Sequence, residues 1–413
     1  MIKTKLDLIV EKSFSKMSYE VSESAEANAL LNRAECEKRE TRLDSLPFRV
    51  RLELTTKCNV NCIFCHRTHF RTDDRSVLSP ADIDRLDPIL RSAKHISLSQ
   101  KAESLMSPHI IPILDKMANY EAVFYMSSNG LLLNDDISRA LIRNKITFFS
   151  ISANAFNEDY ENFYVGGKFD DLERNIARLN ELKKEANSVL PRLRLSFVLR
   201  KDTLQNLDAA LEFIKRHDFS EGVQVLSFFS FVDEDRHLEP ALHWPDYEED
   251  IARLRQKAAA YNIPFELDVD GLDGMRPPAR QDYVSNCYEP WESFNVTPDG
   301  NIFTCTSARE VMGNFRDESP LEIWNGEKFQ KFRSRMNGKP YNNDCTECWH
   351  CRYVSPQVIG EKLAKADKIF DSYYRREKPL KSKLQLANEL LKSGFGGTGK
   401  NARPVSNSLA QID

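Results

Sequence analysis

The stretch RVRLELTTKCNVNCIFC, residues 49–65, decides which fold class and which chemistry the sequence predicts. Residues 49–55 alternate between polar and apolar side chains, which indicates a half-buried β-strand. Cys58, Cys62 and Cys65 follow this strand directly. In parallel α/β barrels, the loops that follow the strands build the active site. We therefore expect a loop rich in thiols at the end of the first strand of an α/β domain.

Strands and helices alternate after this loop. The later strands are expected at residues 95–99, 122–127, 147–152, 193–199 and 223–229. The clearest helix, residues 170–186, carries leucine and isoleucine at helical spacing. Six strands that alternate with helices imply parallel pairing through right-handed crossovers. This periodicity fits a partial or complete α/β barrel and equally an open doubly wound sheet.

The composition excludes several classes of protein. The 413 residues are 41% hydrophobic and 29% charged, and the formal net charge is −4. Nucleic-acid binding depends on a basic surface, which this charge does not supply. No apolar run is long enough to span a membrane, and residues 1–16 lack the apolar stretch of a secretion signal. We expect a cytoplasmic protein that binds neither nucleic acid nor membrane.

The nine cysteines indicate metal binding. An odd number of cysteines without a signal peptide argues against a disulfide framework. Three thiolates within eight residues can bind three irons of a four-iron cluster, which leaves the fourth iron open. The alternative is a zinc knuckle that His66 or His69 completes.

A second group of cysteines lies near the end of the chain. Asp299-Gly300 separates two apolar stretches and predicts a β-hairpin, which places Cys305 at the end of its second strand. The other members of this group are Cys287, Cys345, Cys348 and Cys351. Paired Cys-x2-Cys elements build zinc sites as well as iron–sulfur sites, so the spacing leaves both metals open.

The chain divides into five expected segments. These are a charged helical N-terminal extension (1–47), an α/β core (48–240), a linker with a helix (241–280), a small cysteine-rich domain (281–355), and a helical C-terminal extension with a disordered tail (356–413).

The first cysteine loop resembles a known family. Cys-x3-Cys-x-aromatic-Cys after a first strand is the signature of the radical S-adenosylmethionine (radical SAM) superfamily, and Phe64 takes the aromatic position near the adenine. The resemblance implies a partial (β/α)6 barrel followed by a small α+β cysteine-rich cluster domain. It also implies that Cys58, Cys62 and Cys65 hold a [4Fe–4S] cluster whose open iron binds S-adenosylmethionine. One electron then cleaves the sulfonium bond and produces a 5′-deoxyadenosyl radical.

The resemblance extends to other positions of the core. Residues 98–104 replace both glycines of the family's Leu-Ser-Gly-x-Gly-Glu-Pro turn but keep Glu103, which is expected to receive the methionine amine. Ser128-Asn129-Gly130 looks like the Thr-Asn-Gly turn, with a positive φ at its glycine. Similar enzymes contact the ribose and the carboxylate at strand ends, where this chain has Ser152 and Arg200.

The second cysteine group resembles the SPASM and twitch extensions of this family. The resemblance implies one auxiliary [4Fe–4S] cluster, bound by Cys287, Cys305, Cys345 and Cys348. Cys351 is the departure from the twitch pattern. It is expected to be an exchanging ligand or an inert thiol, with a hydrogen-atom donor as the less favoured role.

The resemblance predicts an enzyme of the oxidoreductase or epimerase type. The expected reaction is dehydrogenation or epimerisation of a small-molecule or carbohydrate intermediate of a natural product, with a reductant such as flavodoxin or ferredoxin. Two alternatives remain at this point. One is a maturase that modifies a ribosomally made peptide, and the other is a non-catalytic protein that binds zinc or a cluster and serves in interactions.

Overall fold

The computed structural model describes residues 22–65, 67, 75–228, 233–238, 244–268, 287–306 and 308–336. Several predictions fall outside these ranges. They concern His66, His69, Cys345, Cys348, Cys351 and the helical C-terminal extension with its tail.

A ten-stranded sheet forms the centre of the described structure, with the order β12-β11-β10-β1-β3-β4-β5-β7-β8-β9. Every neighbouring pair in the run β10-β1-β3-β4-β5-β7-β8-β9 is parallel. The pairs β10–β11 and β11–β12 are antiparallel. The strands are β1 (Arg49–Leu52), β3 (His95–Ser97), β4 (Val123–Ser128), β5 (Phe148–Ser152), β7 (Arg192–Leu199), β8 (Val223–Ser227), β9 (Phe265–Asp268), β10 (Ser293–Val296), β11 (Asn301–Phe303) and β12 (Gly313–Asn314).

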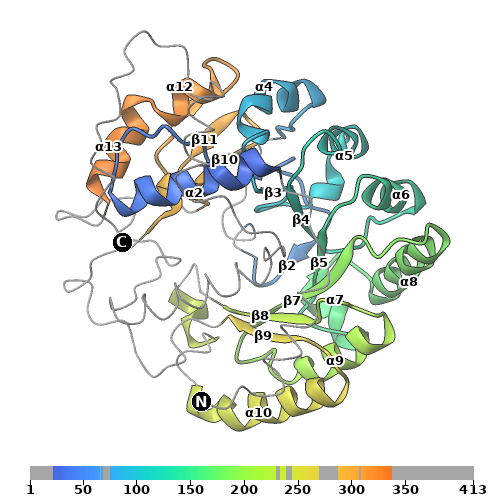
Figure 1. The fold of residues 1–413 in the computed structure, drawn as a ribbon. Helices are drawn as coiled ribbons and strands as arrows, with labels where there is room; N and C mark the ends of the chain where they lie inside the picture. The colour runs from blue at the N-terminus through green and yellow to red at the C-terminus, as the bar shows by residue number, and fades with distance from the viewer. Residues whose placement is uncertain are drawn as a thin grey trace.

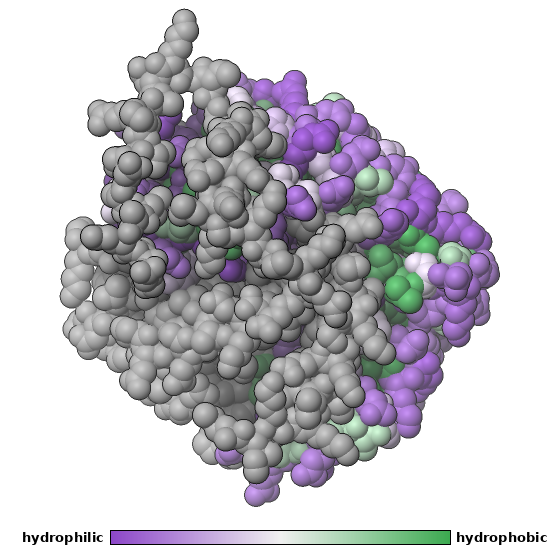
Figure 2. Space-filling view, viewed as in Figure 1, coloured by the Kyte–Doolittle hydropathy of each residue, from purple (hydrophilic) through white to green (hydrophobic). Residues whose placement is uncertain are grey.

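Helices lie in an arc outside the strands, as Figure 1 shows for α4, α5, α6, α8, α9 and α10. Their outward surfaces are mainly hydrophilic where Figure 2 shows them. The helices are α2 (Glu23–Glu37), α4 (Pro80–Leu90), α5 (Ile110–Met117), α6 (Asp135–Arg143), α7 (Tyr160–Phe163), α8 (Phe169–Glu185), α9 (Asn206–Arg216), α10 (Trp244–Ala260), α11 (Glu289–Glu292), α12 (Pro320–Trp324) and α13 (Glu327–Arg335).

The predicted partial barrel is confirmed. All six predicted strands are present, as β1, β3, β4, β5, β7 and β8. The segment predicted as a linker also joins the barrel, because it supplies α10 and the seventh parallel strand, β9. With four residues, β9 is too short for a clear alternating pattern, so periodicity did not reveal it.

Local sequence explains where the helices begin and which face they bury. Ser79 and Asp82 form a capping box at the start of α4, and Pro80 occupies the first turn. In α8, buried Leu172, Ile176, Leu179 and Leu182 face the core. These apolar stripes bind the helices to the outer face of the sheet.

The N-terminal segment is packed against the cysteine-rich domain. The Asn32 side chain on α2 donates to the Trp291 carbonyl oxygen at 2.6 Å. The Trp291 indole donates to the Glu40 carbonyl at 2.7 Å, and the Trp324 indole donates to the Ser45 carbonyl at 2.9 Å. Both indoles are buried, so residues 22–46 form a strap that holds α11 and α12.

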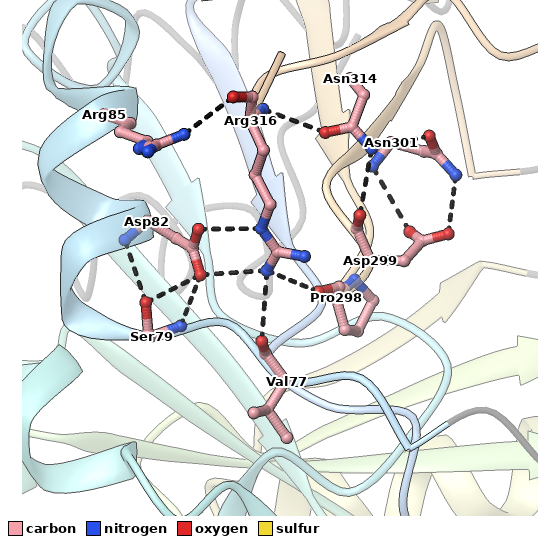
Figure 3. Close-up of polar contacts among 9 residues, drawn as sticks. All are labelled: Val77, Ser79, Asp82, Arg85, Pro298, Asp299, Asn301, Asn314 and Arg316. Carbon is pink, nitrogen blue, oxygen red and sulfur yellow. Dashed lines mark hydrogen bonds and ion pairs between the residues drawn. The ribbon is translucent and has the colours of Figure 1, made fainter.

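Arg316 joins the cysteine-rich domain to the start of α4, as Figure 3 shows. Its guanidinium donates to both carboxylate oxygens of Asp82 at 3.0 Å, and to the carbonyl oxygens of Val77 at 3.3 Å and Pro298 at 2.9 Å. Burial alone would raise the pKa of Asp82, but hydrogen bonds from Arg316 and Ser79 lower it below its ordinary value. The pair therefore stabilises the fold while Asp82 is ionised.

Asp82→Asn and Arg316→Met are each expected to lower the free energy of unfolding by about 1–2 kcal/mol at neutral pH. A double-mutant cycle should give a coupling of about 1 kcal/mol. Because folding depresses the pKa of Asp82, this contribution exists above the unfolded pKa, about 3.9, and disappears as the pH falls through the folded value. Urea unfolding across that range measures it. Arg85→Met is the control, since Arg85 is exposed and, among the described residues, donates to the Arg316 carbonyl and not to Asp82. If the coupling free energy between Asp82 and Arg316 did not change with pH, an ion pair between them would be contradicted.

Candidate active site

The predicted cluster loop lies at the carboxyl end of β1. Its cysteines are partly buried, and the Cys65 amide donates to the Cys62 carbonyl at 3.1 Å. Strand β2 (Asn61–Cys62) pairs antiparallel with β6 (Tyr164–Val165), which pairs Cys62 with Tyr164. The Asn129 side chain donates to Asn59 Oδ1 at 2.8 Å from the turn after β4. Contacts from β6 and from the turn after β4 therefore hold the cysteine loop in place.

The environment of these thiols suits an iron–sulfur cluster. Burial raises the pKa of the Cys58 and Cys62 thiols, so the protein does not by itself favour the thiolates. A bound metal compensates that charge, and metal binding displaces the protons. In the described ranges, no three Cys, His, Asp or Glu side chains converge on a single ion. A cubane does not require such convergence, because each cysteine binds a different iron.

Glu103 is a buried anchor for the turn after β4. It accepts hydrogen bonds from the Ser128 hydroxyl at 2.8 Å, the Asn129 amide at 2.8 Å and the Leu105 amide at 3.1 Å. The Glu103 amide donates to the Lys57 carbonyl, next to Cys58, at 3.0 Å. Glu103 thus connects three loops at the same end of the barrel. Its expected contact with the methionine amine stays a prediction.

The predicted glycine turn is confirmed in its geometry. Gly130 has a φ of 76°, and a Cβ atom there would lie 2.6 Å from Leu172 Cδ1 on α8. The Ser128 hydroxyl accepts from the Gly130 amide at 2.9 Å, and Asn129 Oδ1 accepts from the Leu131 amide at 3.0 Å. A residue with a side chain would strain the backbone and collide with α8.

Phe64 and Arg200 meet above the carboxyl ends of the strands. The Phe64 ring packs edge-on against Tyr164, with 5.7 Å between the ring centres. The Arg200 guanidinium lies 5.9 Å from the Phe64 ring centre. Asp202 accepts two hydrogen bonds from Arg200, at 2.8 and 2.7 Å, so its charge is already paired. The nucleotide and carboxylate contacts expected of these residues stay predictions.

The inner face of the sheet carries charged residues that the sequence reasoning did not select. Arg49 and Arg51 on β1 alternate with Val50 and Leu52, which are fully buried on the helix side. Glu53 follows on the inner face, and burial raises its pKa to about 7. The strict alternation of residues 49–55 was the signal that could have identified them.

The two described cysteines of the second group lie at the opposite end of β1. Cys287 precedes α11 and β10, whereas Cys305 follows β11. Strand β10 runs parallel to β1, and β11 runs antiparallel to β10, so both thiols lie near the amino end of β1. Both are partly buried, as cluster ligands require. The fold therefore separates the two cysteine groups along the inner face.

Known proteins match both regions. The model of the Radical SAM superfamily matches residues 52–214, and the SPASM iron–sulfur cluster-binding domain matches residues 287–351. The AdoMet-dependent heme synthase of Methanosarcina barkeri is 23% identical over 74% of this chain and 92% of its own length. The probable GTP 3′,8-cyclase of Methanothermobacter thermautotrophicus is 32% identical over 65% of this chain and 87% of its own.

Solved structures share the fold. The crystal structure of Streptococcus suis SuiB bound to S-adenosylmethionine has a TM-score of 0.58 at 15% identity, with 83% of this chain and 79% of that chain covered. Native anSMEcpe with bound AdoMet has a TM-score of 0.53 at 14% identity, with 84% of this chain and 100% of that chain covered. Among the described residues, no helix is long and apolar enough to cross a membrane.

The two cysteine groups match the two family models, and the barrel matches the solved structures. This combination implies a [4Fe–4S] cluster, S-adenosylmethionine and auxiliary iron–sulfur binding, and it identifies an enzyme rather than a non-catalytic zinc protein. The chain belongs to the radical S-adenosylmethionine superfamily and carries a C-terminal SPASM domain.

Proposed function

We propose that this enzyme abstracts a hydrogen atom from a hydroxylated small molecule or carbohydrate, which it dehydrogenates or epimerises in the cytoplasm. The polar inner face of the barrel is the observation that supports this substrate class. A flavodoxin- or ferredoxin-type reductant would supply the electron.

Serine hydroxyls line the inner face across four neighbouring strands. Strand pairing places Ser127 beside Ser150 and Ser152 beside Ser196, and Ser97 lies on β3. The Ser127 and Ser152 hydroxyls are 3.2 Å apart. The Ser150 hydroxyl is fully buried and has no hydrogen-bond partner in the described part of the chain. A buried hydroxyl without a partner is costly, and Ser97, Ser127, Ser152 and Ser196 on the same face are partly exposed, so this surface favours a ligand rich in polar groups.

The names of both relatives also refer to small molecules. Heme and GTP are small molecules, and this chain spans most of the length of both curated relatives. SuiB has in addition been solved with the precursor peptide SuiA, and that structure resembles this chain with a TM-score of 0.57 at 13% identity. A peptide substrate is therefore the second candidate.

Each group of residues would have a separate role in the reaction. Cys58, Cys62 and Cys65 would hold the cluster that, with S-adenosylmethionine, supplies the hydrogen-abstracting radical. Phe64 would pack near the adenine, and Glu103 would hold the turn at the methionine end. The inner-face serines would orient substrate hydroxyls, and the concave inner face of the partial barrel would limit the access of water to the reacting carbon.

Stimulation of 5′-deoxyadenosine formation tests the substrate class. The reconstituted enzyme is incubated anaerobically with S-adenosylmethionine, dithionite and a protein-free ultrafiltrate of cell extract. We expect the ultrafiltrate to raise product formation at least about tenfold, because a bound and positioned substrate donates its hydrogen atom to the 5′-deoxyadenosyl radical. Treating the ultrafiltrate with a nonspecific peptidase should leave this effect intact. Loss of the effect after peptidase would favour the peptide maturase.

Ser150→Ala and Ser196→Ala test the inner face directly. Each should weaken the stimulation by the ultrafiltrate and leave the slow, substrate-free cleavage unchanged. Thr203→Ala would not be a suitable control because Thr203 is buried and bonded to β7. Ser334→Ala is suitable, since Ser334 is exposed on α13 and its hydroxyl donates to the Lys331 carbonyl of the same helix. Unchanged stimulation in both inner-face variants would contradict the proposed role of these hydroxyls.

A further inference from the structure

A group of opposite charges lies where the barrel meets the cysteine-rich domain. Arg51 on β1 donates to Glu289 Oε2 at 2.8 Å and to Glu289 Oε1 at 3.3 Å. It also donates to the Ser293 hydroxyl at 3.2 Å and to Asn295 Oδ1 at 3.1 Å. Within the described part of the chain, the hydrogen bonds of this guanidinium are with α11 and β10, although Arg51 belongs to the first strand of the barrel.

Arg49 extends this group. Its guanidinium lies 3.8 Å from Glu289 and 3.4 Å from Glu292. A carboxylate that accepts two hydrogen bonds from one guanidinium is paired as an anion. Two arginines therefore face two glutamates across the boundary.

The same group lies beside both described cysteines of the second group. Glu289 is two residues from Cys287 in the chain. Strand β11 pairs Phe303 with Asn295, so Cys305, two residues later, lies on the same face as Ser293 and Arg51.

We propose that Arg51 and Glu289 are positioning residues that set the reduction potential of the auxiliary cluster in opposite directions. Reduction adds one electron and therefore one negative charge to the cluster, and no bond forms or breaks in that step. The cation of Arg51 stabilises the reduced form and raises the potential. The anion of Glu289 destabilises it and lowers the potential. The ion pair holds both charges at a constant distance from the cysteines.

The contact also has a geometric consequence. Arg51 belongs to β1, which is followed by the radical-generating loop. Glu289 lies in α11 just before β10, and β10 is connected through the hairpin to β11 and then Cys305. The ion pair therefore joins the two cysteine-bearing elements through parallel neighbours β1 and β10. The side chains are 26% and 28% exposed, so water partly screens them and the effect of each charge is moderate.

Potentiometric titration followed by electron paramagnetic resonance tests the proposal without substrate or S-adenosylmethionine. The Cys58→Ala, Cys62→Ala and Cys65→Ala background removes the radical-generating cluster, so the signal belongs to the auxiliary cluster. In this background, Arg51→Met should lower the reduced-to-oxidised ratio at constant ambient potential about tenfold, which corresponds to about 59 mV for a one-electron couple. Glu289→Gln should shift the ratio in the opposite direction.

Two further variants distinguish a charge effect from a packing effect. Arg51→Lys keeps the positive charge, so the auxiliary cluster of that variant should have a reduction potential near the parent value. In the Arg51→Met and Glu289→Gln double variant, the reduction potential should return toward the parent value, because the effects of the two lost charges cancel. Shifts of the same sign in both single variants, or no shift in either, would overturn the proposal.

Iron content completes the test. The background variant should bind about four irons per chain, as one four-iron cluster requires. Binding of no iron would overturn the placement of an auxiliary cluster beside Arg51. None of these measurements depends on the substrate, so failure of the proposed substrate class would leave the result unaffected.

Discussion

Simultaneous replacement of Cys58, Cys62 and Cys65 by alanine is expected to abolish 5′-deoxyadenosine formation. The three thiols belong to one short loop at the carboxyl end of β1, and burial raises the pKa of two of them. Cysteines in such surroundings are poor nucleophiles but good ligands once a metal displaces the protons. The described part of the barrel has no other group of three cysteines that could hold a cluster to reduce S-adenosylmethionine.

The measurement combines product formation with iron content. Reconstituted parent protein should bind about eight irons per chain and the triple variant about four, because only the auxiliary cluster remains. Product formation with dithionite should fall to the background rate. Cys36→Ala is the matched control: Cys36 is a buried thiol on α2, and burial raises its pKa to about 12. This variant should keep both iron and activity. Equal product formation in the triple variant would contradict the assignment of the radical-generating loop.

Removal of the Glu103 carboxylate is expected to give the largest loss of stability among single changes at this site. Glu103→Ala leaves the Ser128 hydroxyl and the amides of Asn129 and Leu105 without their buried acceptor. Each unsatisfied buried group costs about 1–3 kcal/mol, so the free energy of unfolding should fall by about 4 kcal/mol. Because the turn after β4 also positions Gly130, S-adenosylmethionine should bind at least about tenfold more weakly.

A conservative variant separates shape from charge. Glu103→Gln keeps the volume but turns an amide NH₂ group toward one of the donors, so about half of the loss in stability should remain. Urea unfolding measures the stability, and equilibrium dialysis with the reconstituted protein measures the binding. Glu161→Ala is the control, since Glu161 is exposed on nearby α7. Parent stability in Glu103→Ala would show that the carboxylate does not hold the turn.

Local features of the fold were predictable from short-range patterns. The capping box of α4 and the positive φ of Gly130 involve residues within a few positions of one another. Backbone conformation and capping depend on such neighbours, so sequence alone identifies them. The loop of Cys58, Cys62 and Cys65 was recognised in the same way.

Contacts between distant segments were not predictable in this way. Arg51 and Glu289 are 238 residues apart, and Arg316 and Asp82 are 234 residues apart. Local patterns place Arg51 on one face of its strand and Asp82 in the first turn of α4, but they do not identify the distant partner of either side chain. Their partners follow from the parallel pairing of β1 with β10 and from the position of the hairpin against α4.

Sequence patterns alone are enough to predict an alternating α/β core, a three-cysteine loop after its first strand and a second cysteine group near the end of the chain. Those properties depend on periodicity and spacing, which are local. The three-dimensional structure is needed to show that the SPASM hairpin extends the barrel sheet, that residues 22–46 hold it in place, and that Arg51 lies between the two cysteine groups. These depend on which surfaces bury one another, and burial is a property of the whole packed chain rather than of any segment.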